Sequence, residues 1–176
     1  MEKGENKMNE NIYSDNFDEN WDIYDKALRK IGIRKRREVL EDGEFHLVVG
    51  VFLFDKDGNV LLQKRSMTKL NNPGQWQESA GGSVLSGETA VNAIQRELEE
   101  ELGLTTKFSQ EDCFFQNINK DWITIWFSKE LDFDIKNLVI QELEVDKIVL
   151  LKIEDAINYL KSSKLKNILV EASRNI

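Results

Sequence analysis

The alternation of apolar and polar segments predicts several short strands in the first two thirds of the chain. Residues 46–54 form a continuous apolar run rich in valine and phenylalanine, which favours a buried strand. The sequence Asp57-Gly58-Asn59 separates this run from a second apolar segment at residues 60–65, so we expect two strands joined by a tight turn. Further strands are predicted at residues 76–80, 107–115, 122–127 and 147–151.

Residues 88–102 have the pattern of a helix. They contain no glycine or proline, and they end at Gly103, a residue type that commonly stops helices. Apolar residues recur at spacings of three and four, which predicts a stripe that lies on the sheet: Ala90, Val91, Ile94, Leu98 and Leu102. Two more helices are predicted at residues 153–161 and 165–173.

The segments outside these elements divide the chain into a leader and one domain. Residues 1–19 are rich in Asn, Glu and Asp, so we expect a flexible leader followed by a domain at residues 20–176. Residues 21–34 carry apolar residues on both sides of a polar turn, which favours a hairpin, with a brief helix around Ala27 as the alternative. Surface loops are expected at residues 66–74, around Pro73, and at residues 81–87. Because strands and helices do not alternate regularly, the expected fold class is α/β, with a mixed sheet between helices.

Composition narrows the classes of function. With 176 residues, of which 40% are hydrophobic and 32% charged, the chain can bury one core. A net charge of −8 argues against binding to a nucleic-acid polymer, and no apolar stretch reaches the roughly 20 residues that span a bilayer. Cys113 is the sole cysteine, so no intramolecular disulfide can form and a cytoplasmic location is expected. One cysteine and one histidine, His46, cannot build a zinc site.

A cluster of glutamates on the predicted central helix is the strongest candidate for chemistry. Residues at i, i+3 and i+4 share a helix face, so Glu97, Glu100 and Glu101 are expected to project together beside the apolar stripe. Three like charges at this spacing repel one another. A divalent cation such as Mg²⁺, which prefers oxygen ligands, would turn that repulsion into ligation. The alternative is a solvated acidic helix face.

The sequence around these glutamates, GSVLSGETAVNAIQRELEEELGL at residues 82–104, resembles the Nudix box. The match covers every defined position of that motif: Gly82, Glu88, Arg96, Glu97, Leu98, Glu100, Glu101, Gly103 and Leu104. This resemblance implies an α/β/α sandwich and a hydrolase that cuts a diphosphate linkage with Mg²⁺ or Mn²⁺. A nucleoside diphosphate joined to another group is the substrate class that it implies.

The resemblance also implies roles for individual residues. The implied metal ligands are Glu97, Glu100, Glu101 and the backbone carbonyl of Gly82. Arg96 would orient a glutamate, and Glu88 would brace the loop or contact the metal through water. Gly103 would end the helix, as expected for a glycine at that position. Candidate catalytic residues are Glu100, Arg96 and Glu144.

A glutamate from a later loop is the expected base. Attack on a diphosphate requires neutralised phosphate oxygens, an acidified water and a group that takes its proton. Related enzymes often use a glutamate from a later loop as the base or as an extra ligand, and residues 141–145 resemble that element. We favour Glu144 over Glu142. The alternative for both is an ordinary polar loop that precedes a strand.

The resemblance extends upstream, over about residues 21–160, to the branch that also contains isopentenyl-diphosphate isomerase. That isomerase needs a catalytic cysteine and a histidine-rich metal site. Where it carries Cys-Gly-His, this chain has Gly81-Gly82-Ser83, which argues against isomerase activity. Cys113 is expected to be a small core residue, and His46 to make a structural hydrogen bond at the start of a strand.

Substrate contacts are less specified by the sequence. Arg65 could bind a phosphate or end a strand as a solubilising charge, and Trp76 and Trp122 could stack on a base or pack in the core. The expected partner is a small-molecule diphosphate, and no membrane association is expected. The resemblance makes a homodimer plausible. A domain that only binds nucleotides is the remaining alternative, although such domains typically lose carboxylates that this chain retains.

Overall fold

The computed structural model describes residues 15–176, and the first two strands of this part form a β-hairpin. β1 (Asn20–Tyr24) pairs antiparallel with β2 (Lys30–Lys35), which confirms the hairpin predicted for residues 21–34. The Asp25 carboxylate accepts hydrogen bonds from the backbone N–H groups of Ala27 and Arg29 at 2.9 and 3.0 Å. Ala27 therefore lies in a turn, and the alternative of a helix there is wrong.

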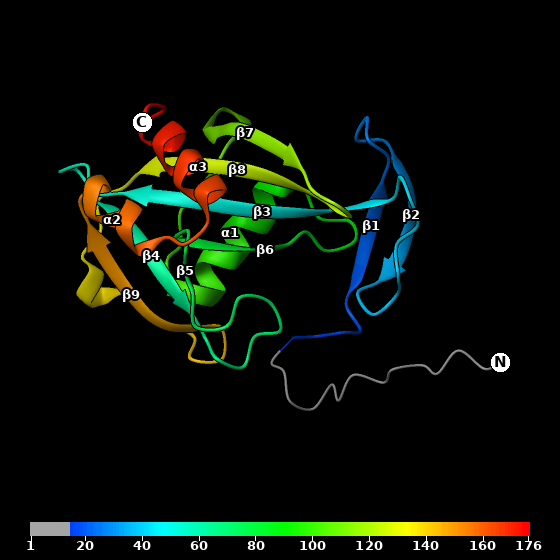
Figure 1. The fold of residues 1–176 in the computed structure, drawn as a ribbon, viewed down its shortest axis with the longest axis horizontal. Helices are drawn as coiled ribbons and strands as arrows, with labels where there is room; N and C mark the ends of the chain where they lie inside the picture. The colour runs from blue at the N-terminus through cyan, green and yellow to red at the C-terminus, as the bar shows by residue number, and fades with distance from the viewer. Residues whose placement is uncertain (1–14) are drawn as a thin grey trace.

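The described residues form one mixed sheet of nine strands, built around the long strand β3 (Phe45–Phe54). β3 pairs in parallel with β8 (Trp122–Glu130) and antiparallel with β1 and with β6 (Ala80–Ser83). Figure 1 shows β3 and β8 side by side, with the β1–β2 hairpin at the end away from α2. The other strands are β4 (Val60–Arg65), β5 (Trp76–Gln77), β7 (Cys113–Ile118) and β9 (Val145–Leu151).

The sheet opens between β3 and β4. These two strands pair only at Phe54 and Val60, and the segment at residues 76–83 passes between them, because β5 pairs with β4 and β6 pairs with β3. Ser79 lies at the crossing point: its hydroxyl donates to the carbonyl of Leu61 and accepts the N–H of Leu53 at 2.8 Å. The opening creates space at the centre of the fold.

Two predictions for this segment are corrected. The single strand expected at residues 76–80 is two short strands, because the chain changes partner at Ser79. The loop expected from Gly81 begins only after Ser83, since Gly81 and Gly82 pair with Gly50 and Val49 of β3. The glycines allow close approach of neighbouring groups here, which explains their presence in a strand.

Helices cover both faces of the sheet. α1 (Ala90–Leu102) packs on one face in a core that includes Val49, Val51 and Leu53. On the other face α2 (Ile153–Tyr159) and α3 (Ser163–Ser173) pack in a core that includes Phe52 and Phe54. The alternation of side chains along β3 supplies both cores, and the predicted α/β/α arrangement is confirmed. The predicted bounds of α2 and α3 differ from the observed ones by two residues at one end each.

Local side chains determine the ends of α1. Thr89 caps its N-terminus by accepting the N–H of Asn92 at 3.2 Å, so the helix begins two residues later than predicted. Gly103 ends it in the left-handed conformation, with φ of 63°, as expected for a C-terminal glycine. Ile94, Leu98 and Leu102 of the predicted stripe are fully buried, while Ala90 and Val91 are half-buried against the same core.

The strand predicted at residues 107–115 is mostly wrong. β7 begins only at Cys113, after the short 3-10 helix η2 (Gln110–Asp112). Ser109 and Asp112 form a capping box around η2, and these side-chain bonds to backbone N–H groups compete with strand pairing. A second 3-10 helix, η3 (Ile135–Asn137), precedes β9, which begins two residues before the predicted start.

The described residues begin inside the predicted leader. Residues 1–14 lie outside the described part, but Asp15 and Phe17 are 8% and 7% exposed. The domain boundary that we predicted at residue 20 therefore falls within a packed segment. Among residues 15–176, no helix has the length and apolar character needed to cross a bilayer.

Candidate active site

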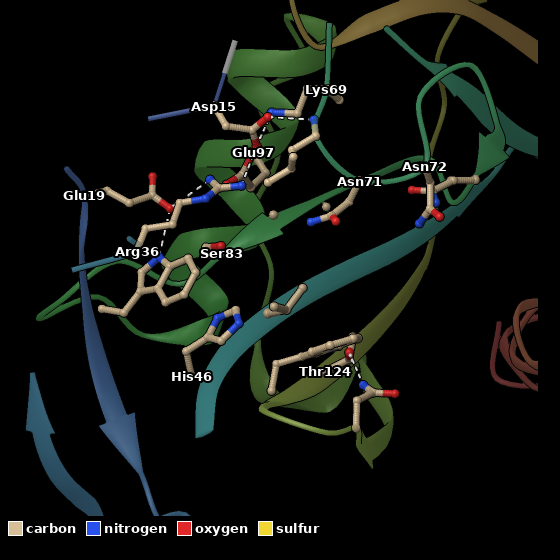
Figure 2. A pocket seen from close by; sticks show the side chains of 18 of the residues that line it. Asp15, Glu19, Arg36, His46, Lys69, Asn71, Asn72, Ser83, Glu97 and Thr124 are labelled. Carbon is tan, nitrogen blue, oxygen red and sulfur yellow. Dashed lines mark hydrogen bonds and ion pairs between the residues drawn. The ribbon is translucent and has the colours of Figure 1, made fainter. Parts of the chain in front are cut away.

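An open cleft of about 1520 Å³ lies over the opening in the sheet. Its walls come from segments that are far apart in the sequence: α1, β6, the loop after β4, the loop before β9, and residues 15–19. The acidic face of α1 contributes Glu97, Glu100 and Glu101. Figure 2 shows Glu97 in this cleft together with Asp15 and Lys69.

Arg96 organises the acidic residues of α1 and of the loop before it. Its guanidinium donates to both carboxylate oxygens of Glu88, at 2.9 and 3.0 Å. It also donates to Glu97 at 2.7 Å, to Glu100 at 3.1 Å and to the backbone carbonyl of Ser83 at 3.0 Å. Burial opposes its charge, but the bonds to Glu88 and Glu97 raise the pKa of Arg96 above its ordinary value. One cation thus holds three carboxylates in fixed positions.

The three glutamates differ strongly in exposure. The Glu100 side chain is 52% exposed and that of Glu97 is 12% exposed, whereas Glu101 is 3% exposed. The Glu101 carboxylate accepts hydrogen bonds from the side-chain amide of Gln63 at 3.1 Å and from the N–H of Gly81 at 3.2 Å. Both of these donors are neutral, so they do not balance its charge.

Burial and mutual repulsion raise the pKa values of the inner pair. Burial raises the pKa of Glu97 to about 7, against the attraction of Arg96, and Glu100 and Glu144 add to the rise. Burial also raises the pKa of Glu101 well above its ordinary value, and the nearby Glu97 raises it further. The floor of the cleft therefore holds carboxylates with too little positive charge around them.

Gly82 is required by the position of Glu97. A Cβ atom on Gly82 would lie 2.2 Å from Oε1 of Glu97, far inside any ordinary contact. Gly81 is also crowded, because a Cβ there would lie 2.6 Å from the carbonyl oxygen of Val49. Gly82 thus lets the end of the Glu97 side chain lie directly against the strand backbone, and Gly81 allows close approach of β3.

The donor set fits a divalent cation by its chemistry. Glu97, Glu100 and Glu101 offer carboxylate oxygens; Glu101 has no charged partner, and Glu97 shares the single charge of Arg96 with Glu88 and Glu100. Within residues 15–176 no three His, Cys, Asp or Glu side chains are gathered as a ready metal cage. Glu97 and Glu100 each bond Arg96 through one carboxylate oxygen, so the second oxygen of each could bind a cation while Arg96 stays in place.

Glu144 faces the carboxylates from the loop before β9. It lines the cleft and raises the pKa values of Glu97 and Glu101 by its charge. Its carboxylate pairs with the ammonium group of Lys69 at 2.7 Å. Glu142 is exposed and does not line the cleft. Of the two glutamates considered as the base, Glu144 is the one that lines the cleft.

The structure separates the three residues considered for substrate contact. Arg65 lines the cleft, where its Nε donates to the carbonyl of Asn71 at 2.9 Å, and Trp122 lines it with 37% of its surface exposed. Trp76 does not line the cleft. Its ring packs edge-on against Tyr159 with 5.3 Å between centroids, beside the core under α2 and α3. Of the two tryptophans, only Trp122 is placed to meet a bound molecule.

Cys113 and His46 have structural surroundings. Cys113 packs against the core under α1 and does not line the cleft, as expected for a small core residue. His46 stacks on Trp21 with 3.8 Å between ring centroids, and burial lowers its pKa to about 4. Nδ1 of His46 is buried and has no partner among the described residues at ordinary hydrogen-bond geometry. The adjacent Leu47 backbone still acts on the imidazole as a hydrogen-bonding group and raises its pKa slightly against the effect of burial. The predicted structural hydrogen bond is therefore a weak contact to Leu47, and stacking on Trp21 is the main interaction of the ring.

Sequence reasoning missed Gln63, which donates a hydrogen bond to Glu101, and two charged residues that line the cleft. Gln63 follows Leu61 by two positions on a strand, so its polar side chain on the buried face was a usable signal. Lys69 lies in a segment predicted as a surface loop, yet its side chain is 8% exposed. Asp15 lies in the predicted leader and reaches the cleft only through tertiary packing. No local pattern distinguishes those last two residues from solvated charges.

Comparison with known proteins places these features in a wider group. A family model described as NUDIX domain matches residues 44–171. An uncharacterised Nudix hydrolase of Listeria innocua is 38% identical over 131 residues, which cover 72% of this chain and 76% of that protein. An isopentenyl-diphosphate Delta-isomerase of Serratia proteamaculans is 33% identical over 98 residues, or 56% of this chain and 55% of that protein. These matches confirm the motif and the branch that the sequence indicated.

The same fold is found in a solved structure. The crystal structure of a Deinococcus radiodurans protein matches with a TM-score of 0.68 at 19% identity, and it covers 88% of this chain and 99% of that one. At this level of identity the match concerns the fold alone.

Proposed function

The chain belongs to the Nudix family of hydrolases, which act on pyrophosphate-containing compounds, and from this premise we propose that it cleaves a diphosphate linkage in a nucleoside diphosphate joined to another group. The observation that carries the proposal is the acidic cluster on the floor of an open cleft: Glu101 is buried with neutral hydrogen-bond partners alone, and Glu97 shares one cation, Arg96, with Glu88 and Glu100. Carboxylates that outnumber the cations around them destabilise the fold, so their presence together indicates that a bound positive charge completes the site.

A bound divalent cation would balance these negative charges. Mg²⁺ or Mn²⁺ held by Glu97, Glu100 and Glu101, with the Gly82 carbonyl as a further ligand, would neutralise phosphate oxygens and acidify a bound water. Arg96 holds Glu97 and Glu100 in place through its hydrogen bonds. Its paired bonds to Glu88 fix the loop before α1 to the helix itself.

Glu144 is the proposed base. Its carboxylate lines the same cleft, and its charge contributes to the raised pKa values of Glu97 and Glu101, which supports a position near the proposed metal ligands. A base must lie close to the proton that it takes, and geometry is the first requirement. In this role Glu144 accepts the proton of the attacking water while the bond to the leaving phosphate breaks.

Arg65 and Trp122 are proposed to hold the substrate. Arg65 lines the cleft at the end of β4 with a planar guanidinium, which suits bidentate recognition of phosphate. Trp122 lines the same cleft with 37% of its surface exposed, so a base or another flat group could stack on it.

A substrate screen tests the proposal. The purified full chain is incubated with nucleoside diphosphate sugars, dinucleoside polyphosphates, nucleoside triphosphates and isopentenyl diphosphate, with Mg²⁺, Mn²⁺ or EDTA, and products are identified by mass spectrometry. We expect metal-dependent hydrolysis of a diphosphate linkage. Glu101→Gln should reduce the rate by about 100-fold or more, because the metal loses a ligand. The metal-free variant should be no less stable than the parent, because the variant no longer buries a charge.

Glu99→Gln is the matched control. Glu99 lies on the same helix between the proposed ligands, but its side chain is exposed and does not line the cleft, so its loss should change the rate less than twofold. Tight nucleotide binding without turnover and without a metal would favour a sensor instead. Conversion of isopentenyl diphosphate to its isomer would contradict the argument from Gly81 and Ser83.

A further inference from the structure

Asp15 is a buried charge at the edge of the cleft. Its side chain is 1% exposed, and its carboxylate pairs with the guanidinium of Arg36 and with the ammonium group of Lys69 at 3.2 Å. Its second oxygen accepts the backbone N–H of Leu70 at 2.9 Å. Burial alone would raise its pKa, but these partners hold the pKa of Asp15 below its ordinary value. Figure 2 shows Arg36 and Lys69 on either side of this carboxylate.

Lys69 links Asp15 to the proposed base. Its ammonium group lies 3.2 Å from Asp15 and 2.7 Å from Glu144, and its side chain is only 8% exposed. Lys69 thus shares one positive charge between two carboxylates that are 129 positions apart in the chain. Because an ammonium group on a long flexible stem has no fixed direction of its own, the second carboxylate determines where it points.

Hydrogen bonds to the backbone also join the segment before Lys69 to the segment that carries Glu144. The N–H of Ser66 donates to the carbonyl of Glu144 at 2.9 Å, and the hydroxyl of Thr68 donates to the carbonyl of Leu143 at 3.2 Å. One carboxylate oxygen of Glu144 is held by Lys69, while the other accepts no hydrogen bond from residues 15–176. The arrangement fixes the carboxylate by one oxygen and leaves the other available to a proton.

Two roles for Asp15 are conceivable, and burial decides between them. Asp15 could be a plug that leaves the cleft when a substrate phosphate arrives. That role would require the ion pair of the buried Asp15 and Lys69 to break in every cycle, together with the pair to the partly exposed Arg36, and separating a buried ion pair is strongly destabilising. A permanent positioning role has no such cost.

We propose that Asp15 is a positioning residue for Glu144: it anchors the ammonium group of Lys69, which in turn holds the base in place. Asp15 is then part of the catalytic machinery and lies outside residues 44–171, which the family model covers. The role of Glu144 is that of the proposed function, so this inference rests on it.

A double-variant cycle with Asp15→Asn and Glu144→Gln tests this. Asp15→Asn keeps the shape of the side chain and removes its charge. We expect kcat to fall roughly 10- to 100-fold, as for the loss of groups that orient a reacting residue, with KM changed less than about threefold. In the Glu144→Gln background, Asp15→Asn should reduce kcat less than about twofold further, because the group that it positions is already lost.

Asp18→Asn is the matched control, since Asp18 lies in the same segment with 65% of its side chain exposed and pairs with Lys35 on the hairpin. Its kcat should equal that of the wild type. If Asp15→Asn does not fold, Asp15→Asn combined with Lys69→Met removes both charges of the pair together, and kcat should then fall roughly 10- to 100-fold, because Glu144 has lost its anchor. Circular dichroism establishes folding of every variant.

The outcomes separate the two claims. Effects of Asp15→Asn and Glu144→Gln that multiply, or a wild-type kcat for Asp15→Asn, would overturn the positioning role while leaving the hydrolase intact. A rise in KM at constant kcat would overturn it too, and would assign Asp15 to substrate binding. A wild-type protein that hydrolyses nothing in the screen would refute the proposed function, and with it this role.

Discussion

Substitution of Gly82 by alanine should separate stability from activity. Gly82 lies in β6 with an ordinary strand conformation, so an alanine there meets no backbone penalty. Its Cβ would lie 2.2 Å from Oε1 of Glu97. Because optimal contacts between heavy atoms are about 3.5 Å or more, the Glu97 carboxylate must move by roughly 1 Å. That carboxylate is the end of a flexible side chain, so it can move while the strand stays in place.

The cost to stability is therefore modest. Movement weakens the 2.7 Å hydrogen bond from Arg96, and a bond to a charged group contributes about 1.5–3 kcal/mol. Part of this loss is offset, because Glu97 is buried and repelled by its neighbours, as its raised pKa indicates. We expect the free energy of unfolding to fall by about 1–2 kcal/mol. A displacement of 1 Å at a reacting site can reduce the rate about 100-fold, so kcat/KM should fall by about that factor.

Urea unfolding and metal-dependent hydrolysis, measured on the same preparation, check both numbers. Gly32→Ala is the control: Gly32 is also a strand glycine, but a Cβ there would meet only the Arg34 side chain at 3.5 Å, an ordinary contact. If Gly82→Ala matched Gly32→Ala in activity, the position of Glu97 would be irrelevant to the reaction. A loss of stability well above 3 kcal/mol would show that the backbone moves instead, and would refute the reasoning.

Three further outcomes follow from the fold. Because the folded-state pKa of His46 is lowered from 6.5 to about 4, its contribution to stability is present above pH 6.5 and is lost as the pH falls towards 4, by up to roughly 3 kcal/mol. Proton NMR of this sole imidazole checks it, and a midpoint near 6.5 would contradict it. Gly103→Ala, at φ of 63°, should lower stability by about 1–2 kcal/mol in thermal unfolding with kcat unchanged; a drop in kcat would implicate the C-terminus of α1 in the site. Deletion of residues 1–19 should lower the melting temperature well below that of a deletion of residues 1–14, because it removes the buried Phe17 and leaves Arg36 and Lys69 without Asp15; equal melting temperatures would refute the packing of this segment.

Much of the fold could be predicted from local sequence, because local rules decide those parts. α1 has a helical apolar period and a glycine stop, and the strands at β3 and β4 are continuous apolar runs around a turn. The break at Ser79 could not be predicted, because it depends on which neighbour each half of the segment pairs with. The predicted start of β7 was wrong for a local reason, the capping box of Ser109 and Asp112.

For the site, the sequence indicated the residues of the motif but not how strongly they differ in exposure. Helical spacing places Glu97, Glu100 and Glu101 on one side of α1, yet only the packing against β4 and β6 buries Glu101 and leaves Glu100 half exposed. The contribution of Asp15 depends on contacts with residues more than fifty positions away. Such contacts have no period and no local signal, so they emerge only from the folded chain.

The hydroxyl of Ser79 joins β3 to β4 at the point where the two strands separate. These hydrogen bonds affect how the domain unfolds. The segment that carries Gly81 and Gly82 cannot leave without breaking both strand pairings, and those strands supply the cores on both faces. Amide hydrogens of β6 should therefore exchange with solvent only through the global opening reaction, at the same rate as those of β3. We therefore expect no local unfolding of the cleft floor; it should unfold only when the whole domain unfolds.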